Sequence, residues 1–562
     1  MHGIRRSYLA PTLFALFATL WQPSCLAADE AIVSRIEAME AGFPVQVLGN
    51  RLMAHQALSA FYGANGYQRV WQSAELRRQL IDSVEQASDD GLNPADYHAD
   101  ILSGLMLRPM SDYSEDLRAD LDLLFSDAFL MLSSHMLVGK VNPQTVHAEW
   151  TANRRQRQME SVLRDALERS DITGTLDSLR PSDPAYRKLM TARQDLTRLL
   201  GQPWLPLASR PTIRPGDSDE RLSEIRRRLS LLGELAQGTE TGTDPLDYDA
   251  ELEAAMMGFQ ARHGLESDGL IGRDTVTALN LMPVERLRQI DATLERWRWL
   301  PETLGDTYVL VNIAGFEMKM VENGEEVLRK RVIVGQPFRQ TPVFSDRIRY
   351  LVFNPTWTVP RTVMIQDQLP QIVRDPDYLS RLNISVYRGW GADRQKLDPL
   401  DVDWSSLNRN NFPYQLVQEP GPQNALGQVK FMFPNQYDVY LHDTPGRGLF
   451  SRAERSFSSG CIRVEQPFDL AERLLASAPG WSREKIDRVV SGAEPETVVL
   501  PKPVPVHIQY WTSWVDNEGQ LQFRNDLYNR DARLIDQLRK TAEGDTRYTT
   551  PVSVSNPERA KL

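Results

Sequence analysis

A histidine and a cysteine lie 19 positions apart in the last quarter of the chain. His442 ends an alternating stretch that predicts a strand, and Cys461 follows Ser458, Ser459 and Gly460, small residues that are typical of a turn. A turn that returns beside the strand would bring the two side chains together as a thiolate–imidazolium pair. A cysteine activated in this way attacks a carbonyl carbon and carries the acyl group as a thioester. These residues therefore predict a cysteine nucleophile with a histidine base.

The chain has 562 residues and two cysteines, and the other one, Cys25, lies in an N-terminal leader. Basic residues, a short apolar stretch and small residues follow one another there, the order of a secretory signal peptide, which we predict over residues 1–28. Export leaves Cys461 without a partner for an internal disulfide, which favours a reactive thiol over an inert one. Two alternatives stay open: a leader retained as an inner-membrane anchor, and a lipoprotein attached at Cys25, which Gln22 and Pro23 disfavour.

The composition is that of an ordinary globular protein, with 41% hydrophobic and 25% charged residues. The length allows three or four domains. The net charge of −11 gives no sign of nucleic-acid binding. The most apolar later stretch, residues 128–138, is too short for a membrane span and predicts a buried core helix.

The spacing of apolar residues predicts a multidomain α+β protein. Residues 29–210 are mostly helical in pattern and end in a proline-rich linker, which predicts a helical scaffold domain. Residues 217–282 predict a compact unit of three helices. Residues 283–305 predict a charged connecting helix, whose Trp297 and Trp299 we expect to be packing anchors.

From residue 306 the apolar period changes to two, which predicts a mainly β domain over residues 306–500. Residues 360–420 break the pattern and predict an insertion with its own helix, which we expect to cap the cleft. The last stretch, residues 501–562, predicts a hairpin from segments 506–511 and 520–523, followed by a polar tail with a disordered end.

The three-helix unit resembles a known binding module. The phrase Phe-Gln-x-x-His-Gly-Leu-x-x-Asp-Gly-x-Ile-Gly-x-x-Thr, which begins at Phe259, is similar to the signature of the peptidoglycan-binding domain of cell-wall enzymes. The resemblance implies a module that holds glycan or stem peptide and does no chemistry. A three-helix bundle without binding function is the alternative.

The residues around Cys461 resemble the active-site motif of the L,D-transpeptidases, the YkuD family. That motif is a His, a gap of about fifteen residues, then Ser/Thr-His-Gly-Cys, and here fifteen residues separate His442 from Ser458. The resemblance covers nearly all of the chain after the leader, and it departs at Ser459, which stands where the family has a second His. Residues 334–345 resemble the family's substrate-proximal loop, and residues 354–360 and 424–427 resemble the large periplasmic, YcbB-type subgroup.

The departure at Ser459 favours His442 as the base, because adjacent Cys and His side chains on a sharp turn diverge. The resemblance implies that the backbone carbonyl of Asp443 orients the imidazole, and the Asp443 side chain is the alternative. The backbone amides of Ser459, Gly460 and Cys461 are candidates for an oxyanion hole.

Three further side chains are candidate substrate contacts. Arg463 can pair with a stem-peptide carboxylate, or it can fix its own loop to a nearby acid. Trp357 and Tyr440 can line the cleft, and core packing is the alternative for each.

The resemblance implies an L,D-transpeptidase of the periplasm whose partners are peptidoglycan stem peptides and glycan. Cys461 would attack the third residue of a tetrapeptide stem, release the terminal D-alanine and pass the acyl group to a second stem as a 3–3 cross-link. Acylation by carbapenems is implied too, and no cofactor or metal is expected. The alternatives are an L,D-carboxypeptidase or endopeptidase, a lipoprotein-anchoring enzyme and a non-catalytic wall-binding scaffold.

Overall fold

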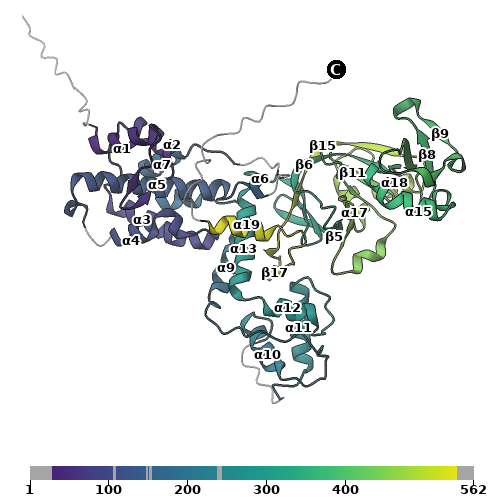
Figure 1. Cartoon of the computed structure of the whole chain (residues 1–562), viewed down its shortest axis with the longest axis horizontal. Helices are drawn as coiled ribbons and strands as arrows, with labels where there is room; N and C mark the ends of the chain where they lie inside the picture. Colours follow the sequence, from purple (N-terminus) through teal and green to yellow (C-terminus); the bar gives the residue numbers. More distant parts are fainter. Residues whose placement is uncertain (1–27, 106–108, 147–149, 151–154, 237–243, 541–562) are drawn as a thin grey trace, which may run out of the picture.

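The computed structural model describes residues 28–540 apart from residues 106–108, 147–149, 151–154 and 237–243. The predicted signal peptide, with Cys25, and the predicted disordered end fall outside the described residues. The described chain forms a helical domain at one end, a β domain at the other, and a three-helix module that projects from between them (Figure 1). The predicted α+β architecture is confirmed.

The helical domain is built around one long helix, α5 (Glu115–Val138). Ser114 caps it by accepting a hydrogen bond from the amide of Leu117. The helix is long and apolar enough to cross a membrane, but 89% of its apolar stretch is buried against the rest of the domain. It is a core helix, as predicted for residues 128–138. The other elements of this domain are α1 (Glu30–Glu40), β1 (Gln46–Val47), β2 (Asn50–Arg51), α2 (His55–Ala64), α3 (Ala74–Glu85), α4 (Ala99–Leu105), α6 (Pro143–Val146), α7 (Met159–Arg169), α8 (Ile172–Asp177) and α9 (Pro184–Thr197).

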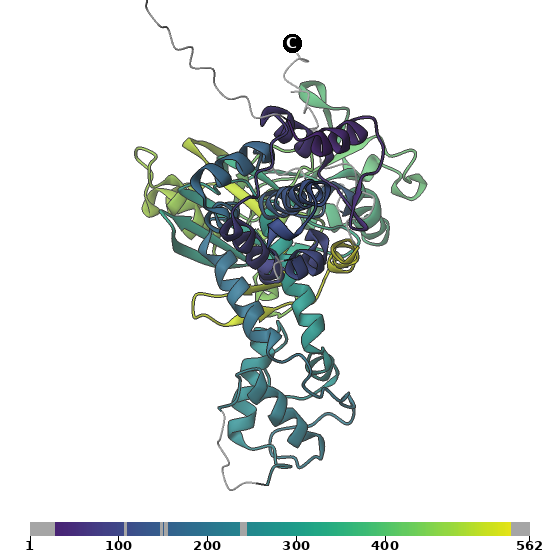
Figure 2. The ribbon, with the colours of Figure 1, turned by 90° about the vertical axis from the view of Figure 1, so that its left-hand side faces the viewer.

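The predicted connecting helix is α13 (Pro283–Arg298), which runs beside α9 between the helical domain and the module (Figure 2). At its end, Trp297 stacks on Trp511 with ring centres 4.3 Å apart, and Trp299 meets Trp150 edge-on at 4.9 Å. Both tryptophans are buried, so they are packing anchors, as predicted.

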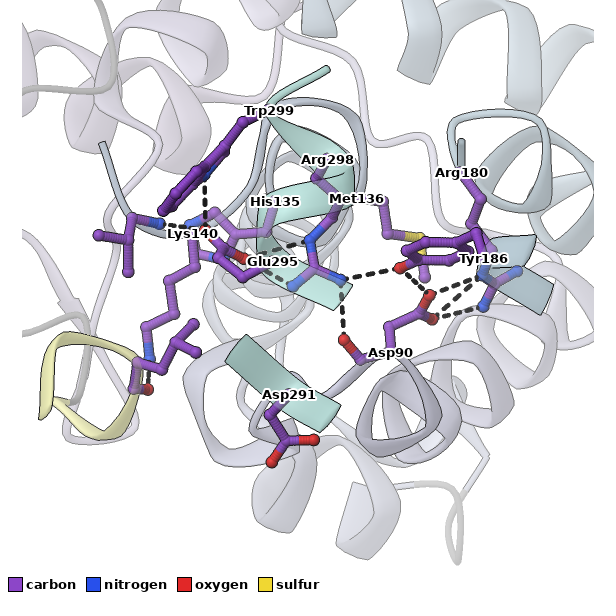
Figure 3. A network of polar contacts seen from close by, with 12 residues as sticks. Asp90, His135, Met136, Lys140, Arg180, Tyr186, Asp291, Glu295, Arg298 and Trp299 are labelled. Atoms are coloured by element: carbon purple, nitrogen blue, oxygen red, sulfur yellow. Dashed lines mark hydrogen bonds and ion pairs between the residues drawn. The ribbon is translucent and has the colours of Figure 1, made fainter. Parts of the chain in front are cut away.

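A buried polar network joins α13 to the helical domain (Figure 3). Arg298 and Glu295 form an ion pair of 2.6 Å with both side chains fully buried. Arg298 also donates to the backbone oxygen of Asp90 and to the hydroxyl of Tyr186. The carboxylate of Asp90 accepts from Tyr186 and is paired with Arg180 at 2.7 Å. Each charge in the network therefore has a partner of opposite sign.

The three-helix module consists of α10 (Arg221–Leu231), α11 (Ala250–Arg262) and α12 (Arg273–Asn280), packed around a core of their own. It rests on the C-terminal hairpin of the chain. His263 lies between the rings of Phe259 and Phe523, with ring centres 3.9 Å and 5.6 Å away. Arg524 donates to the backbone oxygen of Arg262 across the same contact.

The β domain is a nine-stranded sheet with the order β13-β5-β14-β12-β11-β6-β15-β3-β4, and it closes on itself because β4 also pairs with β5. Its interior holds a large apolar core, which α17 (Pro467–Leu475) and α18 (Arg483–Val490) help to cover. The strands are β3 (Thr307–Asn312), β4 (Glu317–Glu322), β5 (Glu325–Gly335), β6 (Phe344–Phe353), β11 (Val429–Met432), β12 (Leu441–His442), β13 (Ser456–Ser458), β14 (Ile462–Val464) and β15 (Glu496–Gln509).

The insertion, residues 357–418, has its own small sheet, with the order β7-β10-β8-β9, and its own apolar core. The predicted helix is present in this region, but the sequence analysis did not identify the sheet. The strands are β7 (Trp357–Thr358), β8 (Ile384–Arg388), β9 (Gln395–Leu397) and β10 (Tyr414–Gln418); the helices are α14 (Arg361–Val363), α15 (Leu369–Arg374) and α16 (Tyr378–Arg381), with a π-helical turn at Met364–Gln368.

The C-terminal segment differs from the prediction. Residues 506–509 are not part of a hairpin but the end of β15, which pairs in parallel with β3 inside the main sheet. The hairpin is formed by β16 (Ser513–Val515) and β17 (Leu521–Phe523), and the polar stretch after it contains a helix, α19 (Asp531–Arg539). Residues 506–509 belong to β15 because they pair with β3, which is distant in the sequence. The spacing of residues cannot reveal such pairing.

Candidate active site

Two neighbouring parallel strands carry the predicted pair. In β12 and β14, Leu441 pairs with Ile462 and His442 pairs with Arg463. Side chains alternate along a strand, and paired residues point to the same face. His442 and Arg463 therefore share one face, and Cys461 lies on the turn directly before β14, two residues before the partner of His442.

Tyr440 and a backbone carbonyl surround the sulfur of Cys461. The thiol contacts the backbone oxygen of Asp438 at 3.7 Å, and the amide and hydroxyl of Tyr440 hydrogen-bond the thiolate form. Burial nevertheless raises the pKa of the Cys461 thiol to about 11, against the lowering effect of Tyr440 and Arg463. The thiol is therefore protonated at neutral pH in the free protein.

The imidazole of His442 is held in one tautomer. Its Nδ1 lies 2.6 Å from the backbone oxygen of Asp443, and because a carbonyl only accepts, Nδ1 carries the hydrogen. Nε2 then keeps its lone pair and can act as a base. Burial, with the nearby charge of Arg463, lowers the pKa of His442 to about 3. The expected thiolate–imidazolium pair is therefore not the resting state, because burial disfavours both charged forms.

The Asp443 side chain has a different partner. Its carboxylate accepts a hydrogen bond of 2.9 Å from the amide of Gln428 and packs tightly on Gly427, where an added Cβ would lie 2.4 Å from the carboxyl carbon. Burial raises the pKa of this carboxyl group. The carboxylate therefore holds the loop before β11, and the carbonyl holds the histidine.

The turn that carries Cys461 is closed by the hydroxyl of Ser458. This hydroxyl donates to the backbone oxygen of Cys461 at 2.5 Å and accepts from the amide of Gly460 at 3.1 Å. Gly460 has a φ of 118°, which an L side chain rarely adopts. Because the Gly460 amide is already used, the amides of Ser459 and Cys461 are the better oxyanion donors. Within the described part of the chain, neither has a recorded acceptor.

Two cations flank the histidine on the same face. Lys430 of β11 pairs with His442 on one side, as Arg463 of β14 does on the other. The Lys430 ammonium lies 5.8 Å from the ring centre of Tyr440, and the Nε of Arg463 is buried without a hydrogen-bond partner. No carboxylate among the described residues forms an ion pair with either cation. The sequence analysis did not identify Lys430, because the register between β11 and β12 is not visible in the sequence.

Arg339, also absent from the sequence predictions, connects the insertion to the turn that carries Cys461. Its guanidinium forms an ion pair of 2.5 Å with Asp367 and donates to Gln366, both in the π-helical turn of the insertion. The same group donates to the hydroxyl of Ser459 at 2.9 Å. Trp357, in contrast, is half-buried against the core of the insertion, where β7 pairs with β10.

Three family models match the chain. Residues 56–192 match a scaffold domain, residues 218–279 a peptidoglycan binding domain, and residues 306–505 the L,D-transpeptidase (YkuD) catalytic domain. Residues 306–505 belong to the L,D-transpeptidase catalytic-domain family. The match ends before the C-terminal hairpin, and it includes β12, β14 and the turn between them.

Similar proteins have names of the same family. A Haemophilus influenzae protein named "Putative L,D-transpeptidase" is 34% identical over 275 residues, which are 48% of this chain and 54% of the relative. The chain therefore spans about half the length of this curated relative. Among solved structures, an L,D-transpeptidase from Mycobacterium smegmatis has a TM-score of 0.17 and 14% identity, with 36% of this chain and 58% of the other covered. One from Xylanimonas cellulosilytica has a TM-score of 0.17 and 13% identity, with 54% and 99% covered.

Proposed function

We propose that this protein is an L,D-transpeptidase that acts on peptidoglycan stem peptides through an acyl-enzyme on Cys461. The observation that carries the proposal is the placement of Cys461 on a closed turn beside the strand of His442, whose imidazole carries its hydrogen on Nδ1 and therefore has its lone pair on Nε2. The match of residues 306–505 to the L,D-transpeptidase catalytic domain supports the same reaction class. A thiol that attacks a carbonyl carbon needs a neighbouring base to remove its proton.

In the first half-reaction, Nε2 of His442 takes the thiol proton while the sulfur of Cys461 attacks the carbonyl carbon of the third stem residue. The amides of Ser459 and Cys461 hold the negative oxygen of the tetrahedral intermediate. When the intermediate collapses, the C–N bond breaks and the imidazolium gives its proton to the leaving D-alanine nitrogen. The thioester remains on Cys461.

In the second half-reaction, the side-chain amine of a second stem attacks the thioester carbon and loses its proton to His442. The C–S bond breaks, the sulfur takes the proton, and a 3–3 cross-link is released. The free thiol and the neutral imidazole are restored. The same thioester is open to water or to a protein lysine, so the acceptor decides between cross-linking, carboxypeptidase activity and lipoprotein anchoring.

Arg463 and Lys430 give the site a carboxylate-binding face. Two cations without an acidic partner favour an anionic ligand, and the stem peptide carries free carboxylates. A bound carboxylate also offsets the repulsion that Arg463 and Lys430 exert on a protonated His442. Substrate binding would therefore raise the pKa of His442 and make it a stronger base at the moment of attack.

The three-helix module supports peptidoglycan as the substrate, because residues 218–279 match a peptidoglycan binding domain. A protein that acts on the cell wall works outside the cytoplasm, and we propose the periplasm. Association with the inner membrane would depend on the N-terminal segment outside the described residues.

Mass spectrometry of protein treated with a carbapenem tests the acyl-enzyme. We expect one adduct, on Cys461, which is lost in Cys461→Ala and forms about 10²- to 10⁴-fold more slowly in His442→Asn, because the base is missing. An unmodified wild type, or an equal adduct on Cys461→Ala, would refute the proposal.

Incubation with purified tetrapeptide muropeptides tests the acceptor. Dimers support cross-linking, whereas shortened monomers support a carboxypeptidase. Peptidoglycan binding without either product, unchanged in Cys461→Ala, is the result expected of a non-catalytic scaffold.

A further inference from the structure

The C-terminal segment lies beyond residues 306–505, which match the catalytic domain, yet one of its side chains enters that domain. The hydroxyl of Tyr528 donates to the backbone oxygen of Gly335 at 2.6 Å and accepts from the amide of Thr341 at 3.2 Å. These two backbone groups are the two ends of the loop 335–341. One buried phenol therefore closes this loop, where a backbone hydrogen bond would otherwise be needed.

The side chain of Thr341 connects the loop 335–341 to the turn that carries Cys461. Its hydroxyl accepts from the amide of Gly335 at 2.9 Å and donates to the backbone oxygen of Gly460 at 2.8 Å. The side chain of Thr341 is fully buried. The loop also turns back tightly, since a Cβ on Gly335 would lie 2.1 Å from the backbone oxygen of Arg339. Tyr528 is thus two hydrogen bonds away from the turn that presents Cys461.

The bond to Gly460 matters because of peptide geometry. The carbonyl of Gly460 and the amide of Cys461 belong to one planar peptide unit, in which C=O and N–H point in opposite directions. Anchoring the carbonyl oxygen on Thr341 therefore aims the Cys461 N–H away from Thr341. This N–H is one of the two amides without a recorded acceptor within the described chain.

Tyr528 is itself rigidly held. Its amide donates to the hydroxyl of Tyr510 at 2.8 Å, and the two rings stack with centres 5.6 Å apart. The guanidinium of Arg530 lies over both rings and donates to the backbone oxygen of Thr341 and the side chain of Gln340. The segment is therefore a fixed support for the loop.

We propose that Tyr528 is a positioning residue of the acyl-transfer reaction: through Thr341 it holds the Gly460–Cys461 peptide so that the Cys461 amide faces the developing oxyanion. The inference rests on the proposed function. It gives the C-terminal segment a part in the chemistry, although none of its described residues, which end at Lys540, hydrogen-bonds to Cys461 or His442.

The test compares two reactions of the same thiol in Tyr528→Phe. Carbapenem acylation passes through an oxyanion, whereas alkylation by iodoacetamide is a displacement at a CH2 group and forms none. We expect the acylation rate to fall roughly 10- to 100-fold, less than the 10²–10³-fold typical of removing an oxyanion donor. Alkylation of Cys461 should stay within about twofold of wild type. Thr341→Val should show the same split.

Tyr62→Phe is the matched control, because Tyr62 is also a buried tyrosine that donates to a backbone carbonyl, that of Asp122 in the helical domain. It should leave both rates unchanged. The inference is overturned if Tyr528→Phe and Thr341→Val are acylated at the wild-type rate, or if acylation, alkylation and melting temperature fall together, as a purely structural role predicts. A wild type that is alkylated but never acylated would refute the proposed function, and the inference with it.

Discussion

The thiol of Cys461 and the imidazole of His442 are both neutral in the resting site. Desolvation disfavours each charged form, and Arg463 and Lys430 further oppose a proton on the histidine. The site therefore resembles a serine-type general-base centre more than a preformed ion pair. In the proposed reaction, the proton would move from Cys461 to His442 when the sulfur attacks, with the carboxylate of the bound substrate balancing the two cations.

This resting state predicts the pH dependence of alkylation. With a thiol pKa of about 11, the thiolate fraction of Cys461 should rise about tenfold per pH unit from pH 6 to 10. The rate of iodoacetamide modification, followed by peptide mass spectrometry at Cys461, should rise with it and show no plateau in this range. A thiolate–imidazolium pair would instead give a plateau beginning near or below neutral pH, and this result would contradict our assignment.

Lys430→Gln tests the carboxylate-binding face without a peptidoglycan substrate. Iodoacetate is an anion and iodoacetamide is neutral, so the ratio of their rates at Cys461 reports the local field and cancels changes in thiol pKa. We expect Lys430→Gln to lower this ratio about fivefold, or ~1 kcal/mol, from the loss of one nearby charge.

Lys188→Gln is the matched control, since Lys188 is exposed on α9 of the helical domain. It should leave the ratio at the wild-type value. An unchanged ratio in Lys430→Gln would show that this lysine does not act on the anion at the sulfur.

The spacing of the motif predicts a turn that returns to the strand of His442, and β14, which follows Cys461, does pair with β12. The sequence could not reveal Lys430, whose position depends on the register between β11 and β12. Nor could it show that the hydroxyl of Ser458 occupies the amide of Gly460. Burial, which determines both pKa values, is a property of the whole fold.

At the scale of elements, Arg339 joins the insertion to the turn that carries Cys461, because it pairs with Asp367 and donates to Ser459. A partly exposed ion pair is worth about 0.5–1 kcal/mol. Asp367→Asn should therefore speed amide hydrogen exchange in residues 361–374 roughly two- to fivefold, as measured by mass spectrometry. The contact with Asp367 is the one that links the insertion to the loop beside the thiol.

Asp375→Asn removes an ion pair of similar type with Arg381, but this pair lies wholly within the insertion. It should change exchange locally and leave residues 361–368 unaffected. If both variants behave alike, Arg339 does not hold the insertion against the turn.

The period-two pattern predicted most strands of the β domain, but two features escaped it. The insertion sheet was missed because its strands are short and separated by 3₁₀ turns. The predicted domain boundary at residue 500 falls inside strand β15, which contains Pro501 and Pro503. They lie where the pairing of β15 with β6 is interrupted between Val499 and Val504, so no ladder hydrogen bond is lost there.

At the scale of the whole molecule, the buried network of α13 joins the helical domain to the rest of the chain. Besides Arg298, Glu295 accepts from the amide of Val141 at 2.7 Å and from the indole of Trp299. Glu295→Gln leaves Arg298 as an uncompensated buried charge, so the free energy of unfolding should fall by about 3 kcal/mol. Urea unfolding followed by circular dichroism measures the change.

Glu302→Gln makes the same chemical change in an exposed pair, with Arg157 at 3.8 Å. It should alter stability by no more than about 0.5 kcal/mol. Equal effects of the two substitutions would show that the network contributes no more than a surface contact.

The packing of His263 between Phe259 and Phe523 has a consequence for how the protein would bind its substrate. These contacts fix the three-helix module against the C-terminal hairpin. The module and the turn that carries Cys461 therefore keep one relative position. With the proposed function, the module would bind one peptidoglycan strand at a fixed distance from Cys461. New cross-links would then form at that distance from the bound strand.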